Sequence, residues 1–143
     1  MDKLTLSRAA AFADAGKLRA LAEEAVSGKT VLLLKAPEKT MILLNVREPV
    51  RQSRFYLGEA LAVHCMVEVD GVRGAAAQLG DDLQKVQAAA ILDAAHTGRF
   101  PGFVSAEAAL LELDAARKAE ELQWASRVRE TQVRFQALED RVS

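Results

Sequence analysis

The last segment of the chain, Ser105 to Ser143, contains neither glycine nor proline, so no residue in it forces a helix to end. One unbroken helix of this length would run about 58 Å at 1.5 Å per residue. A compact domain of this size has a diameter of only ~37 Å. The segment must therefore either break near Leu110–Asp114, or carry its end out of the domain, where it needs a partner.

A stripe recurs at helical spacing along this segment, at Trp124, Val128, Thr131, Phe135 and Leu138, and all of its members but Thr131 are apolar. Opposite charges four residues apart, Arg117 with Glu121 and Glu130 with Arg134, belong on its solvated side. We predict that the stripe binds another protein, because a large apolar stripe in water is unusual for a monomer. The alternative is that the helix folds back across a sheet and buries the stripe within its own domain.

Two short apolar runs, TVLLLK (residues 30–35) and MILLNV (41–46), have the composition of β-strands. The segment between them, APEKT, has the length and composition of a hairpin loop. Because both runs are apolar on both faces, we expect them to lie inside a sheet that is covered on each side.

The only cysteine, Cys65, directly follows His64, which raises the question of a nucleophile beside its base. If Leu61–Val69 is a strand, successive side chains point to opposite faces of the sheet. Cys65 then shares a wholly apolar row, where burial raises the pKa of the thiol and makes it inert. His64 lies on the other face and cannot hydrogen-bond to the thiol. We therefore interpret both residues as structural members of the strand, not as a catalytic pair.

Asp70–Gly71 is a favoured tight-turn dipeptide, and Val72–Leu79 has the pattern of the returning strand of a hairpin. Gly74 and the alanines after it give this strand little bulk, so a helix could pack close above it. Asp81 is expected to cap that helix, over residues 81–97.

Apolar spacing near the N-terminus predicts two short helices, at about residues 5–15 and 17–27. Together these elements predict an α+β fold, an antiparallel sheet of about four strands between N-terminal and C-terminal helices. The chain is expected to be one domain, residues 1–143, with its strands within 30–79 and its last helical segment at 105–140.

Composition excludes several classes of function. The formal net charge of −1 gives no electrostatic footprint for nucleic acid or for an anionic membrane surface. One cysteine cannot form an internal disulfide, and no stretch approaches the ~20 apolar residues of a membrane span. The early acidic residue argues against a secretory signal, so we expect a cytoplasmic protein.

The chemical inventory is short, and we predict no catalytic, cofactor-binding or metal-binding residues. The sequence has no nucleotide-binding glycine motif, no serine-hydrolase motif and no paired cysteines. Asp93 and His96 have the spacing of metal ligands on one helix face, but no third ligand is evident; we expect Asp93 to bond to a neighbouring backbone group or arginine. Three arginines, at Arg47, Arg51 and Arg54, could bind an anion. A cluster of charges of this kind is more often only solvated.

The order of the motifs resembles one family, PhnG, the G subunit of the bacterial carbon–phosphorus lyase system. The similar stretches include APEKTMILL, RFYLGEAL and the strand that ends in Val-Asp-Gly at Gly71, followed by LGDD, AAILDAA and ASRVRETQVRF. The similarity spans nearly the whole chain in the same order. The chain departs from the family pattern where alanines follow Gly74 and where Asp81 replaces an arginine.

The resemblance implies a non-catalytic, accessory subunit in a complex with the H, I and J subunits, acting with the L protein. This assembly displaces adenine from ATP with a phosphonate and forms a ribose 1-phosphonate 5-triphosphate. The rival interpretation is a self-sufficient domain that binds a small anionic ligand, or a small enzyme, using Arg54, Glu59 and His64.

The residues that we expect to serve packing or subunit contact lie either in the motifs that resemble the family or in the apolar stripe of the last helical segment. Gly58 interrupts a strand-like run, as glycine does at a bulge or where another backbone approaches. The full set is Arg54, Phe55, Gly58, Glu59, Gly71, Gly74, Gly80, Asp81, Asp93, Trp124, Val128 and Phe135.

Overall fold

The computed structural model of the chain describes residues 1–47 and 54–142, and among these it does not describe the side chains of 44–47, 54–57 and 131–142. It starts with two helices, α1 (Lys3–Phe12) and α2 (Ala15–Ala25). Asp2 caps α1 by accepting a hydrogen bond from the Thr5 N–H at 2.7 Å, and Asp14 caps α2 through the Gly16 N–H at 2.9 Å. Both helices begin about two residues earlier than the apolar spacing predicted, because these aspartates set their first turns.

A three-stranded antiparallel sheet follows, with the order β1 (Val31–Arg47), β2 (Arg54–Val69) and β3 (Val72–Leu79). The predicted tight turn joins β2 to β3: Asp70 and Gly71 have φ of 47° and 84° and Val69 pairs with Val72. Positive φ at both central residues matches the twist of a hairpin. The α+β class and the antiparallel sheet are therefore confirmed, with one strand fewer than about four.

The missing strand reflects a wrong prediction for residues 36–40. These residues do not form a hairpin loop but stay within β1, a single strand of 17 residues. Because β2 runs alongside for 16 residues, it offers pairing partners to both halves of β1. The polar segment is absorbed as irregularities in the register, between Leu33 and Lys35 and between Lys35 and Glu38.

The expectation that the two apolar runs are covered on both faces is also wrong. Because no hairpin separates the runs, β1 is an edge strand of the sheet. Its large apolar side chains are left exposed over the length of the strand, namely Leu32, Leu33, Leu34, Met41, Ile42 and Leu43.

The helix α3 (Leu83–Thr97) covers one face of β2 and β3. Gly74 allows this close packing, because a Cβ there would lie 2.3 Å from the Ala90 carbonyl oxygen. Asp82, not Asp81, caps the helix by accepting the Lys85 N–H at 3.0 Å. The two acidic neighbours look alike in sequence, and only the backbone geometry selects which one caps. Gly98 caps the C-terminal end of the helix, which ends at Thr97 as the predicted range of 81–97 does.

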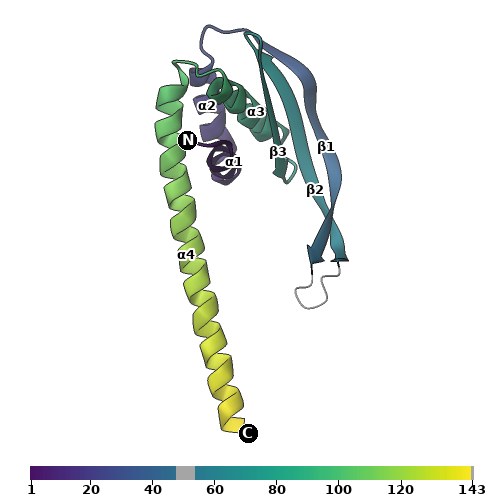
Figure 1. Ribbon diagram of the computed structural model, residues 1–143, viewed down its shortest axis with the longest axis vertical. Helices are drawn as coiled ribbons and strands as arrows, with labels where there is room; N and C mark the ends of the chain where they lie inside the picture. The colour runs from purple at the N-terminus through teal and green to yellow at the C-terminus, as the bar shows by residue number, and fades with distance from the viewer. Residues whose placement is uncertain (48–53, 143) are drawn as a thin grey trace.

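The last element, α4 (Phe103–Val142), is one continuous helix of 40 residues, about 60 Å long. Its first turns pack against α1 and α2, and its remainder extends away from the rest of the chain (Figure 1). The possible break near Leu110–Asp114 does not occur. Among the described residues, no helix is both long and apolar enough to cross a membrane.

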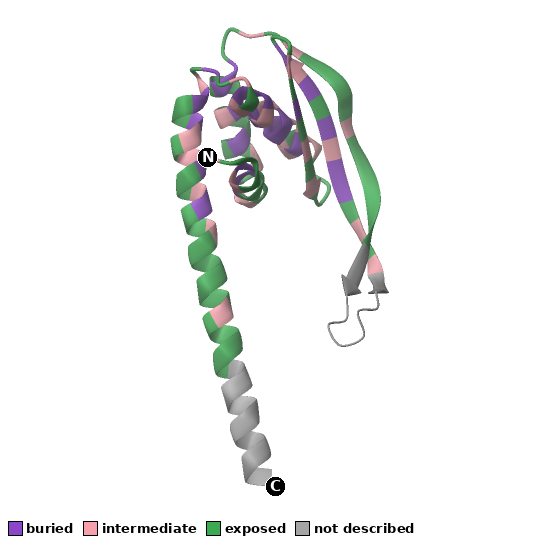
Figure 2. Cartoon of the chain, viewed as in Figure 1, coloured by how far each residue is buried: buried purple, intermediate pink, exposed green. Residues whose placement is uncertain are grey.

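The core lies between the sheet and the helices. It is built mostly from alanine, valine and leucine side chains of α1, α2, α3, β2 and the start of α4, together with Phe100 and Phe103. Figure 2 shows the buried residues gathered in the upper half of the molecule, while the middle of α4 and most of the described part of the edge strand are exposed.

Candidate functional site

The side chains of His64 and Cys65 lie on opposite faces of β2, as predicted. Cys65 is buried in the core, and burial raises the pKa of its thiol. His64 lies on the outer face, where its Nε2 is 3.6 Å from the Glu38 carboxylate. The two neighbours therefore cannot act as a nucleophile and its base.

Asp93 and His96 each bind a different part of the chain. The Asp93 carboxylate accepts a hydrogen bond from the Ala75 N–H at 3.0 Å, which ties α3 to β3. The His96 Nε2 lies 2.7 Å from the Met1 carbonyl oxygen, and its ring packs edge-on against Phe103 at 5.4 Å. Within the described residues there is no cluster of three or more metal-ligating side chains.

The RFYLGE motif contains a strand irregularity. Leu44 pairs with Gly58 and Asn45 with Tyr56, so one residue of β2 is unpaired there. Gly58 has φ of 152°, a conformation that favours glycine, and a Cβ on it would contact nothing within 4 Å. It therefore marks a bulge, the first of the two roles predicted for it, rather than the close approach of another backbone.

The rival anion site is not assembled by the described residues. Glu59 pairs with Leu43 on the same face of the sheet as Cys65, whereas His64 lies on the opposite face. The side chains of Arg47, Arg54 and Phe55, and all of Arg51, lie outside the residues that the structure describes.

A hollow that the sequence did not predict lies between α2, α3 and the start of β1, with a volume of about 390 Å³. Val26 and Ile91 line it with apolar surface, and Gln84 and Gln87 add amide groups. Arg19 and Glu23 at its rim pair with each other at 3.4 Å. Their charges offset each other, so the hollow does not have the character of a strongly charged site.

The feature that stands out is the helix stripe, which we define as Trp124 and Val128 on α4. At 3.6 residues per turn, Val128 lies about five whole turns after Leu110, so both residues share one face of the helix. Leu110 is fully buried, whereas Trp124 is 67% exposed and Val128 is 37% exposed. The face that packs on the core thus continues as an exposed face. Phe135 and Leu138, which would extend the stripe, lie outside the described side chains.

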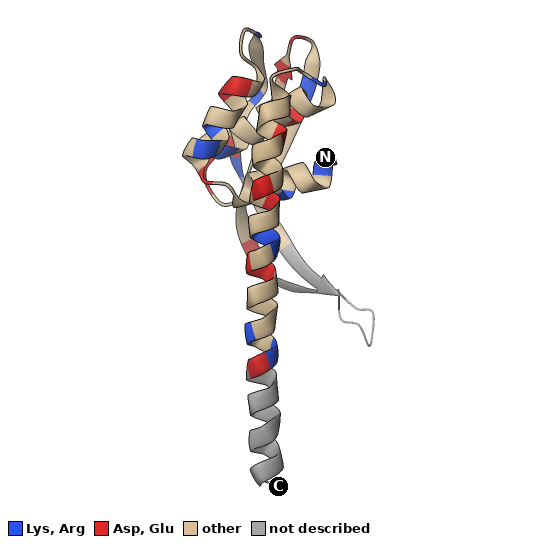
Figure 3. Ribbon diagram, turned by 90° about the vertical axis from the view of Figure 1, so that its left-hand side faces the viewer, with Lys and Arg blue, Asp and Glu red and all other residues tan. Residues whose placement is uncertain are grey.

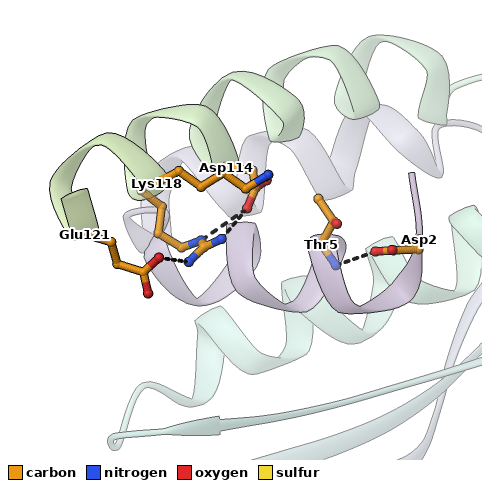
Figure 4. A network of polar contacts seen from close by, with 6 residues as sticks. Asp2, Thr5, Asp114, Lys118 and Glu121 are labelled. Atoms are coloured by element: carbon orange, nitrogen blue, oxygen red, sulfur yellow. Dashed lines mark hydrogen bonds and ion pairs between the residues drawn. The ribbon is translucent and has the colours of Figure 1, made fainter. Parts of the chain in front are cut away.

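A charged network marks the boundary between the two parts of α4 (Figure 4). Asp114 is buried and accepts hydrogen bonds from the Arg117 Nε at 3.1 Å and Nη2 at 2.9 Å, and Lys118 lies at 3.2 Å. Arg117 also donates to Glu121 at 3.1 Å, as its spacing predicted. The hydrogen bonds from Arg117 hold the pKa of Asp114 below its ordinary value, with a smaller contribution from Lys118.

The face of α4 directed away from the domain has a different character. It carries lysines and arginines interspersed with acidic residues, as Figure 3 shows. Exposed apolar residues of α4 are not confined to the helix stripe, because Val104, Leu111 and Leu122 are also exposed and lie about a third of a turn around the helix from Val128.

A second exposed apolar area, the distal sheet face, consists of Met41, Leu43 and Leu61. Met41 pairs with Leu61, and both lie on the face that buries Cys65 further along β2. The three side chains are 55%, 62% and 38% exposed, respectively. This face is thus covered near the hairpin turn and open near the far end of the sheet.

The fold and these surfaces define an α+β protein in which most of the exposed large apolar residues that the structure describes lie on β1 and α4. Its sequence matches the family described as phosphonate metabolism protein PhnG over residues 4–139. The chain belongs to the PhnG family, and its function lies in phosphonate metabolism. The match includes most of the projecting part of α4, so this segment is part of the family sequence. The comparison with curated proteins gave no match.

Proposed function

We propose that this protein is a non-catalytic, accessory subunit of the carbon–phosphorus lyase core complex. In this role it assembles with the H, I and J subunits and acts with the L protein. The complex transfers a phosphonate onto the ribose of ATP and displaces adenine. Membership of the PhnG family supports the pathway, and the surface of the chain supports the role within it.

One observation carries the subunit role: the exposed helix stripe. The indole of Trp124 is 67% exposed, and α4 continues about 40 Å beyond its packed turns. In the isolated chain this exposed indole does not stabilise the fold. Tryptophan is among the residues that most often dominate the binding energy of a protein interface. The distal sheet face adds a second exposed apolar area on the same chain.

The candidate chemical groups support a structural role for this chain. Cys65 is buried, Asp93 holds a strand to α3, and His96 binds the carbonyl group of Met1. Each of these side chains contributes to the fold of the chain itself. We therefore assign the chemistry to other subunits and the architectural contacts to this one.

Co-expression of the tagged chain with the H, I and J subunits tests the proposal. We expect the tagged chain to recover the I subunit in a fixed stoichiometry through affinity and size-exclusion chromatography. A chain that elutes alone, and that binds ATP or methylphosphonate in calorimetry by itself, would instead support the rival small-ligand domain.

A further inference from the structure

Independently of the proposed function, we propose that the hollow between α2, α3 and the start of β1 binds an uncharged nucleobase, and that adenine is the base that fits it best. The flat ring lies between the two helices, with its polar edge toward Gln84 and Gln87. The shape of the hollow, its free amide groups and its balance of charge each support this assignment. None of them depends on a complex with other subunits.

Two helical faces form the walls of the hollow, because α2 and α3 pack against each other beside it (Figure 1). On each side the lining residues recur at i, i+3, i+4 and i+7, over residues 19–26 and 84–91. Ala22 and Ala88 are the smallest of these side chains, and they leave open the space that larger side chains would fill. The volume of about 390 Å³ lies near the lower end of the range for small-molecule pockets, about 300–1,000 Å³. This size fits a single ring system.

Part of the lining is apolar. Val26 follows the last turn of α2, Ile91 lies on α3, and Val31 begins β1, so three different elements contribute a branched apolar side chain. A nucleobase is a flat ring whose faces stack on protein groups while its edge makes hydrogen bonds. Contact with these side chains removes the faces of the ring from water and leaves its edge to polar groups.

The polar groups are the side-chain amides of Gln84 and Gln87, which lie three residues apart on one side of α3. Each amide carries a donor and an acceptor next to each other. Among the residues that the structure describes, neither side chain has a hydrogen-bond partner, so both amides are available to a ligand. Adenine presents an acceptor at N7 beside a donor at N6, the pair that a glutamine amide binds with two hydrogen bonds. The amides therefore select an edge of this kind.

The charges at the rim favour an uncharged ligand. Arg19 is the one cation among the described residues that line the hollow, and its Nε lies 3.4 Å from the Glu23 carboxylate. Because the two charges offset each other, a phosphate group gains little attraction from Arg19 and is repelled by Glu23. The planar guanidinium of Arg19 is still able to stack on a heteroaromatic ring. The base thus enters the hollow, and any phosphate attached to it stays in solvent.

An NMR titration of the full, ¹⁵N-labelled chain with adenine tests the assignment. We expect a dissociation constant below about 1 mM, with the largest changes in chemical shift at the side-chain amides of Gln84 and Gln87. Purine, which is the same ring system without the N6 amino group, should bind at least roughly threefold more weakly, because a glutamine oxygen then loses its donor. Equal affinities for adenine and purine, or no shift at either amide up to about 5 mM adenine, would overturn the proposal.

Adenosine and ATP distinguish the two sources of the base. Adenosine that binds as tightly as adenine identifies the base of a nucleoside as the ligand, and weaker binding of adenosine identifies the free base. ATP should bind no more tightly than adenosine, because the hollow offers no unpaired cation among its described residues. Binding of ATP at least tenfold tighter than that of adenosine would show that phosphate is recognised, and would overturn the assignment of an uncharged ligand.

Substitutions of the two amides give an independent check. Gln84→Leu and Gln87→Leu should each weaken adenine binding roughly fivefold or more, because each removes one amide. Gln123→Leu makes the same change on α4, outside the hollow, and should alter the affinity less than twofold. Gln84 is exposed, so Gln84→Leu keeps the fold, which circular dichroism verifies. Wild-type affinity in both folded hollow variants would contradict the proposal.

A contact with another protein is the competing use of the hollow. If the amide signals of Gln84 and Gln87 move when the partner subunits are added but not when adenine is added, the hollow is a protein interface and the nucleobase assignment is overturned. That result would leave the subunit role intact. Conversely, a chain that binds adenine and recovers no partner subunit would refute the subunit role and retain the nucleobase site.

Discussion

Leu110 and Val128 lie on one face of α4 and differ in what lies opposite them. In the first turns, Leu110 is fully buried against the N-terminal helices. About five turns later, Val128 has the same angular position and remains exposed. The same helical pattern thus provides core packing in one half and a free surface in the other. Periodicity shows which face is apolar, but not whether the chain itself covers that face.

The sheet repeats this contrast. Cys65 and Met41 lie on the same face, Cys65 beneath α3 and Met41 beyond the part that α3 covers. In both elements, the exposed half continues an apolar surface that the core has already used. The chain therefore has more apolar surface than its own helices can cover, which is typical of a protein that completes its packing by assembly.

The largest expected effect compares thiols on the two halves of the sheet. Cys65 should react with a thiol reagent roughly a hundredfold or more slowly in the native chain than in the unfolded chain, because burial raises the thiol pKa and blocks access. In a Cys65→Ser background, Met41→Cys should react at close to the unfolded rate. Stopped-flow labelling measures both rates, and equal protection at the two positions would abolish the contrast.

The next prediction compares the two halves of α4. Leu110→Ala should lower the free energy of unfolding by about 3 kcal/mol, because it leaves a cavity in the core. Val128→Ala should lower it by less than about 0.5 kcal/mol in the isolated chain. Urea denaturation of both variants gives the comparison. A large cost at Val128 would mean that the chain buries its own stripe.

The network at the boundary should make stability depend on pH. Since the folded pKa of Asp114 is lowered, its contribution is present above the unfolded pKa of about 3.9 and is lost as pH falls through the folded value. Asp114→Asn should therefore be less stable than wild type at pH 7, and the gap should close in strong acid. Denaturation at both pH values measures this, with exposed Glu112→Gln as the control. A gap independent of pH would point to packing rather than charge.

The smallest expected effect concerns the helix that covers the sheet. Asp82→Ala removes the cap of α3 and should cost about 1 kcal/mol of stability, whereas Asp81→Ala should cost almost nothing. Thermal unfolding of the pair distinguishes the two aspartates. The reverse ranking would restore Asp81 as the capping residue.

The sequence by itself determined the features that depend on local chemistry. The turn at Asp70–Gly71 needs positive φ, the strand alternation separates His64 from Cys65, and Gly74 admits a helix. A segment without glycine or proline stays helical. Each of these follows from a few neighbouring residues, whose backbone preferences act in any context.

Only the tertiary structure decided the features that depend on distant partners. The polar segment at 36–40 has the composition of a loop, yet the length of β2 holds it in one strand. Asp114, which the sequence did not single out, becomes a buried centre of charge because α4 begins to leave the domain there. Whether an apolar residue is covered depends on what the fold brings opposite it, and spacing along one element cannot contain that information.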